Sequence, residues 1–256
     1  MVNVLVCIKR VPDIGGEILL AGDSMSVDTR YVGHTVSPHE SCAVELAVRT
    51  AAATGGEATV LSLGSADSVE QIRDALAVGC TGAVLVEAEP DRYGPGDVAE
   101  AIADVVRSHE AEGRPYDLVL LGNDAADTGD FQVGIRLAYA LGRPVVAGVS
   151  ALEVDGDVVT ARADGPAGVD IFVVSLPAVV TVMEGGVEPR YPSIPGRMKA
   201  KRVVVETVTP AREPVGSGRV ALRLPPSQPS QVQVLGEGPE AAAAVVDLLE
   251  SLGVAR

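Results

Sequence analysis

Four times within roughly its first 150 residues, this chain follows a short apolar run with an amphipathic stretch. The runs NVLVCI, EATVLSLG, GAVLVEA and DLVLLG are almost continuously apolar, as strands buried on both faces of a sheet should be. In the stretches between them, apolar residues recur at helical spacing. This repeated strand–helix order predicts an α/β fold, with an open, mostly parallel sheet and helices on both of its faces.

Capping residues mark the predicted helix boundaries. Ser37 is a predicted N-cap, Pro38 suits the first helical position, and Glu40 completes a capping box. A pair of glycines at 55–56 should end this helix. The next two helices are expected to open at Asp67 with Glu70 and at Asp97 with Glu100.

The sequence pattern changes after residue 150. VDGDV joins two alternating segments and is typical of a hairpin, and VDIFVVSLPAVVTVM adds one or two strands, so residues 150–184 are expected to be antiparallel and to extend the same sheet. The α/β domain would then cover residues 1–209. Residues 210–256 read as a Pro-, Ser- and Arg-rich arm and a helix in GPEAAAAVVDLLESLGV, which we expect to pack on a partner subunit.

The composition argues against several classes of protein. A net charge of -15 opposes non-specific binding to nucleic acid. No apolar run reaches the roughly 20 residues of a membrane span, and MVNVLVCIKR lacks the features of a signal peptide. Three scattered cysteines without a CxxC spacing argue against a disulfide framework and a metal site. We therefore expect a cytoplasmic protein that is not an integral membrane protein.

The better-known catalytic and nucleotide motifs are missing. The first apolar run is not followed by GxGxxG, and neither GxxxxGK[ST] nor GxSxG occurs in the sequence. None of the three histidines stands beside an obvious nucleophile. This pattern favours a binding or carrier role over an enzyme.

A candidate binding site lies at the carboxyl ends of the predicted strands. An open parallel sheet binds ligands beyond these ends, which fall at residues 7–9, 63–64 and 121–122. The segment NDAADTGD then leads into a helix start, where free N–H groups favour an anion such as phosphate. An ordinary strand–helix connection would read the same way, with Thr128 or Asp130 as the helix cap.

The stretch EPRYPSIPGRMKAKR, residues 188–202, is basic although the chain as a whole is acidic. It holds five Lys or Arg residues against a single acid, Glu188. Its three prolines forbid a regular helix through the first half and stiffen the backbone. A stiff basic loop of this kind suits contact with an acidic partner.

Three stretches of the sequence carry a resemblance to a known family. They are VCIKRVPD at residues 6–13, GNDAADTGDFQVG at 122–134 and LPAVVTVMEGGVEPRYPSIPGRMKAKR at 176–202, of which the last is the most specific. Together they resemble the β subunit of electron transfer flavoprotein, including its FixA-type relatives. The resemblance spans nearly the whole chain.

The resemblance implies a Rossmann-like, adenine-nucleotide-binding fold with a nucleotide in the crevice described above. The nucleotide would be AMP, held structurally, or a second FAD in its place, as in members that bifurcate electrons. The contacts, most of them through the backbone, would fall on Cys7, Ser37, Pro38, His39, Glu40, Leu63, Gly122, Asn123, Asp124, Ala125, Ala126, Asp127, Thr128, Gly129, Asp130, Phe131, Gln132 and Val133.

The resemblance also implies protein partners. A larger α subunit would carry FAD, and the heterodimer would take electrons from flavin-dependent dehydrogenases and pass them to a quinone reductase or another acceptor. Residues 184–202 would be a recognition loop for the dehydrogenase, with Ile194 as an apolar anchor between two prolines. The docking residues would be Glu188, Pro189, Arg190, Tyr191, Ile194, Pro195, Met198, Lys199 and Lys201.

Two other functions remain open at this point. A stand-alone adenine-nucleotide-binding regulator of the universal-stress type shares the strand–helix pattern, but it needs neither the C-terminal arm nor the basic loop. An enzyme that cleaves or transfers adenylate on the same fold would need a catalytic motif, which the sequence lacks.

Overall fold

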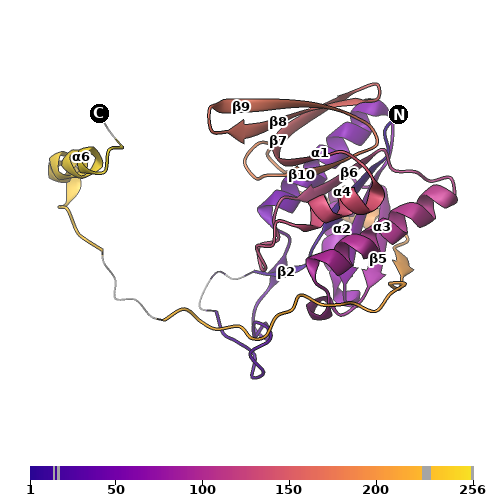
Figure 1. The fold of residues 1–256 in the computed structure, drawn as a ribbon, viewed down its shortest axis with the longest axis horizontal. Coiled ribbons are helices and arrows are strands. Elements are labelled where there is room, and N and C mark those ends of the chain that lie inside the picture. Colours follow the sequence, from indigo (N-terminus) through magenta and orange to yellow (C-terminus); the bar gives the residue numbers. More distant parts are fainter. Residues whose placement is uncertain (14, 16–17, 227–231, 255–256) are drawn as a thin grey trace. The chain divides into compact units, whose positions relative to one another are not determined.

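The computed structural model describes all residues of the chain except 14, 16–17, 227–231 and 255–256 (Figure 1). The chain divides into two compact units, Met1–Leu222 and Arg223–Arg256. The division falls within the predicted arm, and residues 227–231 of that arm lie outside the described residues.

One large sheet forms the centre of the first unit. Among the described residues it has nine strands in the order β11-β5-β4-β1-β6-β10-β7-β8-β9, and every neighbouring pair from β11 to β7 is parallel. This arrangement confirms the predicted mostly parallel α/β fold. The strands are β1 (Val4–Ile8), β4 (Ala58–Gly64), β5 (Gly82–Glu87), β6 (Leu118–Gly122), β7 (Val145–Asp155), β8 (Val158–Gly165), β9 (Gly168–Ser175), β10 (Ala178–Val182) and β11 (Glu206–Val208).

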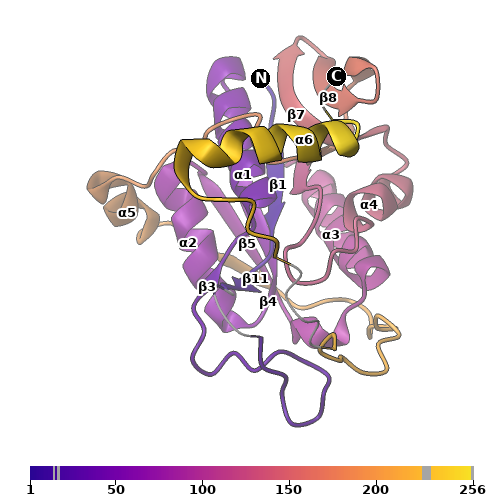
Figure 2. The same ribbon diagram turned by 90° about the vertical axis from the view of Figure 1, so that its left-hand side faces the viewer.

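Helices cover both faces of this sheet (Figures 1 and 2). Apolar residues of α1 and α2 form one core with side chains such as Val4 and Leu120, and those of α3 and α4 form a second core with Leu5 and Val119. Neighbouring residues of one strand thus serve opposite cores, which is why the strands read as continuous apolar runs. The helices are α1 (Pro38–Thr54), α2 (Val69–Val78), α3 (Pro95–Ala111), α4 (Val133–Leu141) and α5 (Ile194–Ala200).

The helix starts confirm one capping prediction and correct two. Ser37 and Glu40 form the predicted capping box of α1, and Gly55 ends that helix in the left-handed conformation. Asp67 does not cap α2, because residues 66–68 form a short 3₁₀ turn, η1, that runs into the helix. Asp97 lies inside α3, where its carboxylate accepts a hydrogen bond from the N–H of the N-cap residue, Gly94.

The antiparallel extension predicted for residues 150–184 holds for three strands but not for the fourth. β7, β8 and β9 pair antiparallel, and Gly156 with φ 61° turns the first hairpin as predicted. β10, however, returns into the sheet and lies between β6 and β7, parallel to both. All five of its residues, AVVTV, are buried, and a strand apolar on both faces is suited to an interior position.

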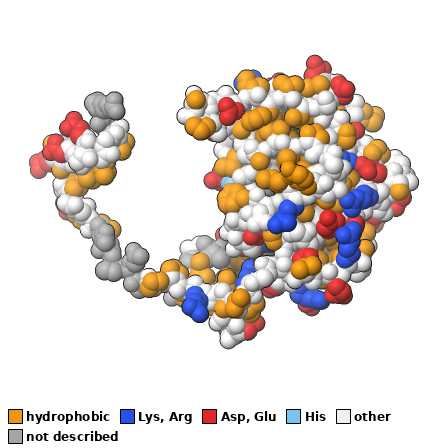
Figure 3. All heavy atoms as spheres, in the orientation of Figure 1, with side chains coloured by type: hydrophobic (Ala, Val, Ile, Leu, Met, Phe, Trp, Pro, Cys, Tyr) orange, Lys and Arg blue, Asp and Glu red, His pale blue; other side chains and the backbone are white. Residues whose placement is uncertain are grey.

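β9 is the last strand of the sheet and exposes apolar side chains. Val169, Ile171 and Val173 project from the same side of this strand, and all three are mostly exposed. In Figure 3, hydrophobic side chains gather over the region where Figure 1 places β8 and β9.

The first part of the predicted arm belongs to the first unit. The carboxylate of Asp97 accepts hydrogen bonds from the backbone N–H groups of Val215 (2.9 Å) and Gly216 (2.8 Å), and the N–H of Leu222 donates to the carbonyl oxygen of Ser24 (2.7 Å). These contacts tie residues 215–222 to the start of α3 and to the loop before β3 (His34–Thr35), which pairs with β2 (Val11–Pro12).

The second unit confirms the predicted C-terminal helix. It contains the short turn η3 (Gly238–Ala241) and the helix α6 (Ala242–Ser251). Val245, Leu248 and Leu252 recur on one side of this helix and are substantially exposed. Within the described parts of the chain, no helix has both the length and the apolar content for crossing a membrane.

Candidate functional site

The carboxyl ends of β4, β1 and β6 bring together the residues that were predicted to hold a nucleotide. These three strands are neighbours in the sheet, and Cys7 of β1 lies in register with Leu61 and Leu121. Leu63 and Gly122 therefore sit near Cys7 at the same edge.

The start of α1 closes against this edge. A Cβ atom on Gly122 would lie 2.7 Å from Cγ of Glu40 and 3.2 Å from Cβ of His39, so the strand end and the helix start are in direct contact. Glycine is the residue that permits this approach. The predicted set Ser37, Pro38, His39 and Glu40 thus lies beside Gly122.

Glu40 links three parts of the edge. Its Oε1 accepts the backbone N–H of Lys9 at 2.7 Å, and its Oε2 accepts the backbone N–H and the hydroxyl of Ser37, both at 3.0 Å. Burial raises the pKa of Glu40 to about 7, because the loss of hydration outweighs the hydrogen bonds from Ser37 and Lys9 and the charge of Lys9. Burial, and to a lesser degree the charge of Glu40, raises the pKa of the Cys7 thiol, so Cys7 stays protonated and packs as a small apolar side chain.

The loop after β6 is held at two points, Asn123 and Asp127. Oδ1 of Asn123 accepts the hydroxyl of Thr181 (2.6 Å) and the N–H of Gly148 (3.1 Å), which ties the loop to β10 and β7. Further along, Nζ of Lys9 lies 2.7 Å from Oδ1 of Asp127, an ion pair that joins the loop to the end of β1. Between these contacts, Thr128 and Gly129 donate their N–H groups to the carbonyl oxygen of Ala125 and close a turn.

The helix cap of the alternative interpretation, Thr128 or Asp130, does not form in the described structure. α4 begins at Val133, and its N-cap residue is Gln132, which makes no capping bond through its side chain. Gly129 and Phe131 have φ values of 60° and 52°, so the backbone turns through the left-handed region before the helix, and Thr128 and Asp130 lie ahead of the cap position.

Two polar atoms of the crevice have no hydrogen-bond partner. Nδ1 of His39 and Oδ1 of Asp124 are buried and unpaired in the described structure, although both residues belong to the predicted nucleotide set. Buried polar groups are nearly always satisfied in proteins, so these two atoms fit a site that is completed by a polar ligand.

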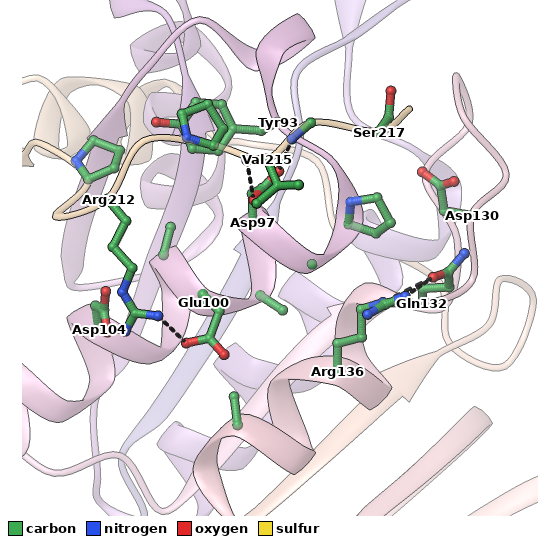
Figure 4. Close-up of a pocket in the computed structure, with 18 of the residues that line it drawn as sticks. Tyr93, Asp97, Glu100, Asp104, Asp130, Gln132, Arg136, Arg212, Val215 and Ser217 are labelled. Atoms are coloured by element: carbon green, nitrogen blue, oxygen red, sulfur yellow. Dashed lines mark hydrogen bonds and ion pairs between the residues drawn. The ribbon is translucent and has the colours of Figure 1, made fainter. Parts of the chain in front are cut away.

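A separate hollow lies elsewhere on the described part of the chain (Figure 4). It has a volume of about 880 Å³ and runs between α3, α4 and residues 210–217. Figure 4 shows Arg212 reaching Glu100, and Arg136 bonded to Gln132. Asp130 and Gln132 line this hollow, so the end of the predicted nucleotide loop borders it, whereas Cys7 and Gly122 are not among its lining residues. No local sequence pattern predicts this hollow, because its walls come from segments far apart in the chain.

The predicted docking segment, residues 184–202, contacts α1 and α2 and contains α5, which lies beside α2 in Figure 2. Tyr191, Ile194 and Met198 expose 93%, 78% and 58% of their surface, while Pro189 is half-buried and the other predicted docking residues are exposed. Lys199 and Lys201 form no ion pair with any residue that the structure describes. Arg190 differs from them, because its guanidinium is bound to Glu45 of α1.

Comparison with known proteins agrees with this arrangement. The family described as electron transfer flavoprotein domain matches residues 24–213. The chain is similar to electron transfer flavoprotein subunit beta of Bacillus subtilis, at 34% identity over 80% of this chain and 77% of the relative. The Homo sapiens protein of the same name is 36% identical over 81% of each chain.

The chain belongs to the electron transfer flavoprotein β-subunit family. The relative from Syntrophomonas wolfei is 32% identical over 94% of this chain and 92% of its own, so that similarity reaches beyond Leu222 into the second unit. The family match covers the start of α1, the loop after β6 and the whole docking segment.

The raised pKa of Glu40 predicts a pH-dependent stability. Folded Glu40 keeps its proton up to about pH 7, whereas an ordinary glutamate releases it near 4.5. The folded state therefore binds more protons between these values, and the free energy of unfolding should fall by about 3 kcal/mol from pH 4.5 to pH 8 through this residue. Urea unfolding at several pH values should show a flatter profile for Glu40→Gln, whose stability is also lower because glutamine has only one acceptor oxygen.

The matched control is Glu45→Gln. Its carboxyl has a pKa of about 2, so it is ionised throughout the window and its loss should leave the slope between pH 5 and 8 unchanged. If Glu40→Gln kept the wild-type dependence of unfolding free energy on pH, Glu40 would not be the residue that causes it.

Proposed function

We propose that this chain is the β subunit of a heterodimeric electron carrier and has no substrate chemistry of its own. It would hold AMP at the carboxyl edge of the sheet, pair with an α subunit that carries FAD, and dock flavin-dependent dehydrogenases through residues 184–202. Electrons would pass to the FAD and on to a quinone reductase or another acceptor. The observation that carries the proposal is the family match over residues 24–213, which includes both the loop after β6 and the docking segment.

The residues at the sheet edge fit a nucleotide such as AMP. Gly122 lets the start of α1 pack against the end of β6, which places His39 at the sheet edge, and the unpaired His39 Nδ1 and Asp124 Oδ1 are polar atoms suited to a polar ligand. The loop 123–132 would hold the nucleotide mostly through its backbone. AMP has no redox chemistry, so its contribution would be to fill the crevice and order this loop.

Two apolar surfaces support pairing with an α subunit. One is the exposed row Val169, Ile171 and Val173 on β9, and the other is the apolar side of α6. Exposed apolar patches of this kind mark protein interfaces more often than free surface.

The docking segment has the composition of an interaction hot spot. Ile194 and Met198 are four residues apart on α5 and so share one side of it, with Tyr191 just before the helix. The exposed cations Lys199 and Lys201 would steer an acidic partner toward this side. Because electron transfer requires the two flavins to be close, the segment would hold the dehydrogenase while the FAD-bearing part of the α subunit moves.

Ile194→Ala tests the docking role. We expect the KM of the heterodimer for its dehydrogenase to rise about tenfold, because an apolar anchor worth about 1.4 kcal/mol or more is lost. The measurement is the rate of electron transfer at increasing heterodimer concentration, with a panel of flavin-dependent dehydrogenases from the source organism, each reduced by its own substrate.

The control for this variant is Ile135→Ala. Ile135 is also exposed, but it lies on α4, on the other side of the sheet from α5. Its substitution should leave KM unchanged. Equal kinetics for Ile194→Ala and the wild type would refute docking through this residue.

The double substitution Leu248→Asp with Leu252→Asp tests pairing through α6. Placing two charges on its apolar side should weaken assembly with the α subunit at least tenfold, because buried charges lose their hydration. Co-purification with a tagged α subunit and titration by light scattering measure the effect. Glu250→Ala, on the same helix, is the control, and full assembly by the double variant would remove α6 from the interface.

A further inference from the structure

The first half of the docking segment is bound to α1 through a single carboxylate. Nε and Nη2 of Arg190 donate to the two oxygens of Glu45, each at 2.8 Å, and the backbone N–H of Arg190 donates to Oε2 at 3.2 Å. The last of these bonds fixes the path of the chain at residue 190 as well as the side chain.

Glu45 is buried, so it can influence a partner protein only through the segment that it binds. Its side chain is 2% exposed, and Nε of Arg49 also donates to it at 2.5 Å. Burial would raise the pKa of Glu45, but the hydrogen bonds from Arg190 and Arg49 outweigh it and lower the pKa to about 2. The carboxylate is therefore ionised at neutral pH and cannot itself touch a partner protein.

The end of the segment is bound to α2 through Arg73. Nη1 of Arg73 donates to the carbonyl oxygen of Ala200 and, at 2.6 Å, to that of Val203. Carbonyl groups at the end of a helix lack helical partners, and a cation there is favourable. A Cβ atom on Gly196 would lie 2.2 Å from the carbonyl oxygen of Ala77, so α5 rests directly on α2.

The exposed apolar residues lie between these two anchors. Tyr191 follows Arg190 directly, and Ile194 and Met198 lie on α5 before the carbonyl groups that Arg73 binds. The three side chains are displayed on a segment whose backbone is already fixed before any partner arrives.

We infer that Glu45 and Arg73 are positioning residues for the dehydrogenase, which hold the docking segment in its bound shape without contacting the partner. The inference rests on the proposed docking function. A segment that must be ordered on binding loses conformational entropy at that moment, and a segment that is already ordered avoids this loss. Removing an anchor should therefore weaken binding while electron transfer within the bound complex continues.

The test uses the heterodimer carrying Glu45→Gln and, as a second variant, Arg73→Met. Hydrogen exchange should show faster exchange of the amides of residues 190–200 in both. With the fastest dehydrogenase of the panel, KM should rise roughly three- to tenfold and kcat should stay within about twofold. Glu110→Gln is the control, because it breaks an Arg–Glu pair with Arg143 on the opposite side of the sheet. It should change neither the amide exchange of residues 190–200 nor KM.

A double-mutant cycle separates positioning from other effects. If Glu45 acts through Ile194, the double variant Glu45→Gln with Ile194→Ala should bind the dehydrogenase little worse than Ile194→Ala alone. Fully additive effects, an unchanged KM in both anchor variants, or a fall in kcat as large as the rise in KM would overturn the inference. If Ile194→Ala raises KM and the anchor variants do not, docking stands and positioning fails. If Ile194→Ala has no effect, the docking function itself fails.

Discussion

The contact between Gly122 and the start of α1 is the constraint on which the rest of the site depends. A side chain at position 122 would collide with Glu40, and only this close approach lets Glu40 accept bonds from Lys9 and Ser37 at once. The carboxylate thereby joins the end of β1, the cap of α1 and the end of β6. The loop after β6 starts from this fixed point, and Cys7, Leu63 and residues 37–40 of the predicted nucleotide set lie beside it.

The same sheet supports two separate surfaces. At its carboxyl edge, backbone groups and a few unpaired polar atoms suit a small ligand. On the outer side of α1 and α2, two anchors hold a segment with exposed Tyr191, Ile194 and Met198, which suits a protein. α1 serves both, because Glu40 faces the strand ends and Glu45, five residues later, faces the docking segment. The proposed function, which would combine a nucleotide at the sheet edge with a protein at the docking segment, needs this separation.

Local patterns predicted the strands, the capping box of α1 and the hairpin at Gly156, because each depends on neighbouring residues. The position of β10 could not be read in this way, since it depends on pairing with β6 and β7 across the sheet. Asp97 has the spacing of a helix opener, yet its carboxylate also binds the backbone of Val215 and Gly216, more than a hundred residues away. The Glu45–Arg190 contact could not be predicted for the same reason. The sequence pattern places Arg190 in the docking segment but assigns no role to Glu45.

The most direct test of the account is the identity of the nucleotides in the purified heterodimer. The complex would be denatured, and the released nucleotides would be identified by mass and quantified against protein. We expect one AMP and one FAD per heterodimer. Two FAD and no AMP would contradict it, because the carboxyl edge of β1, β4 and β6 would then hold a redox flavin and the chain would take part in electron bifurcation.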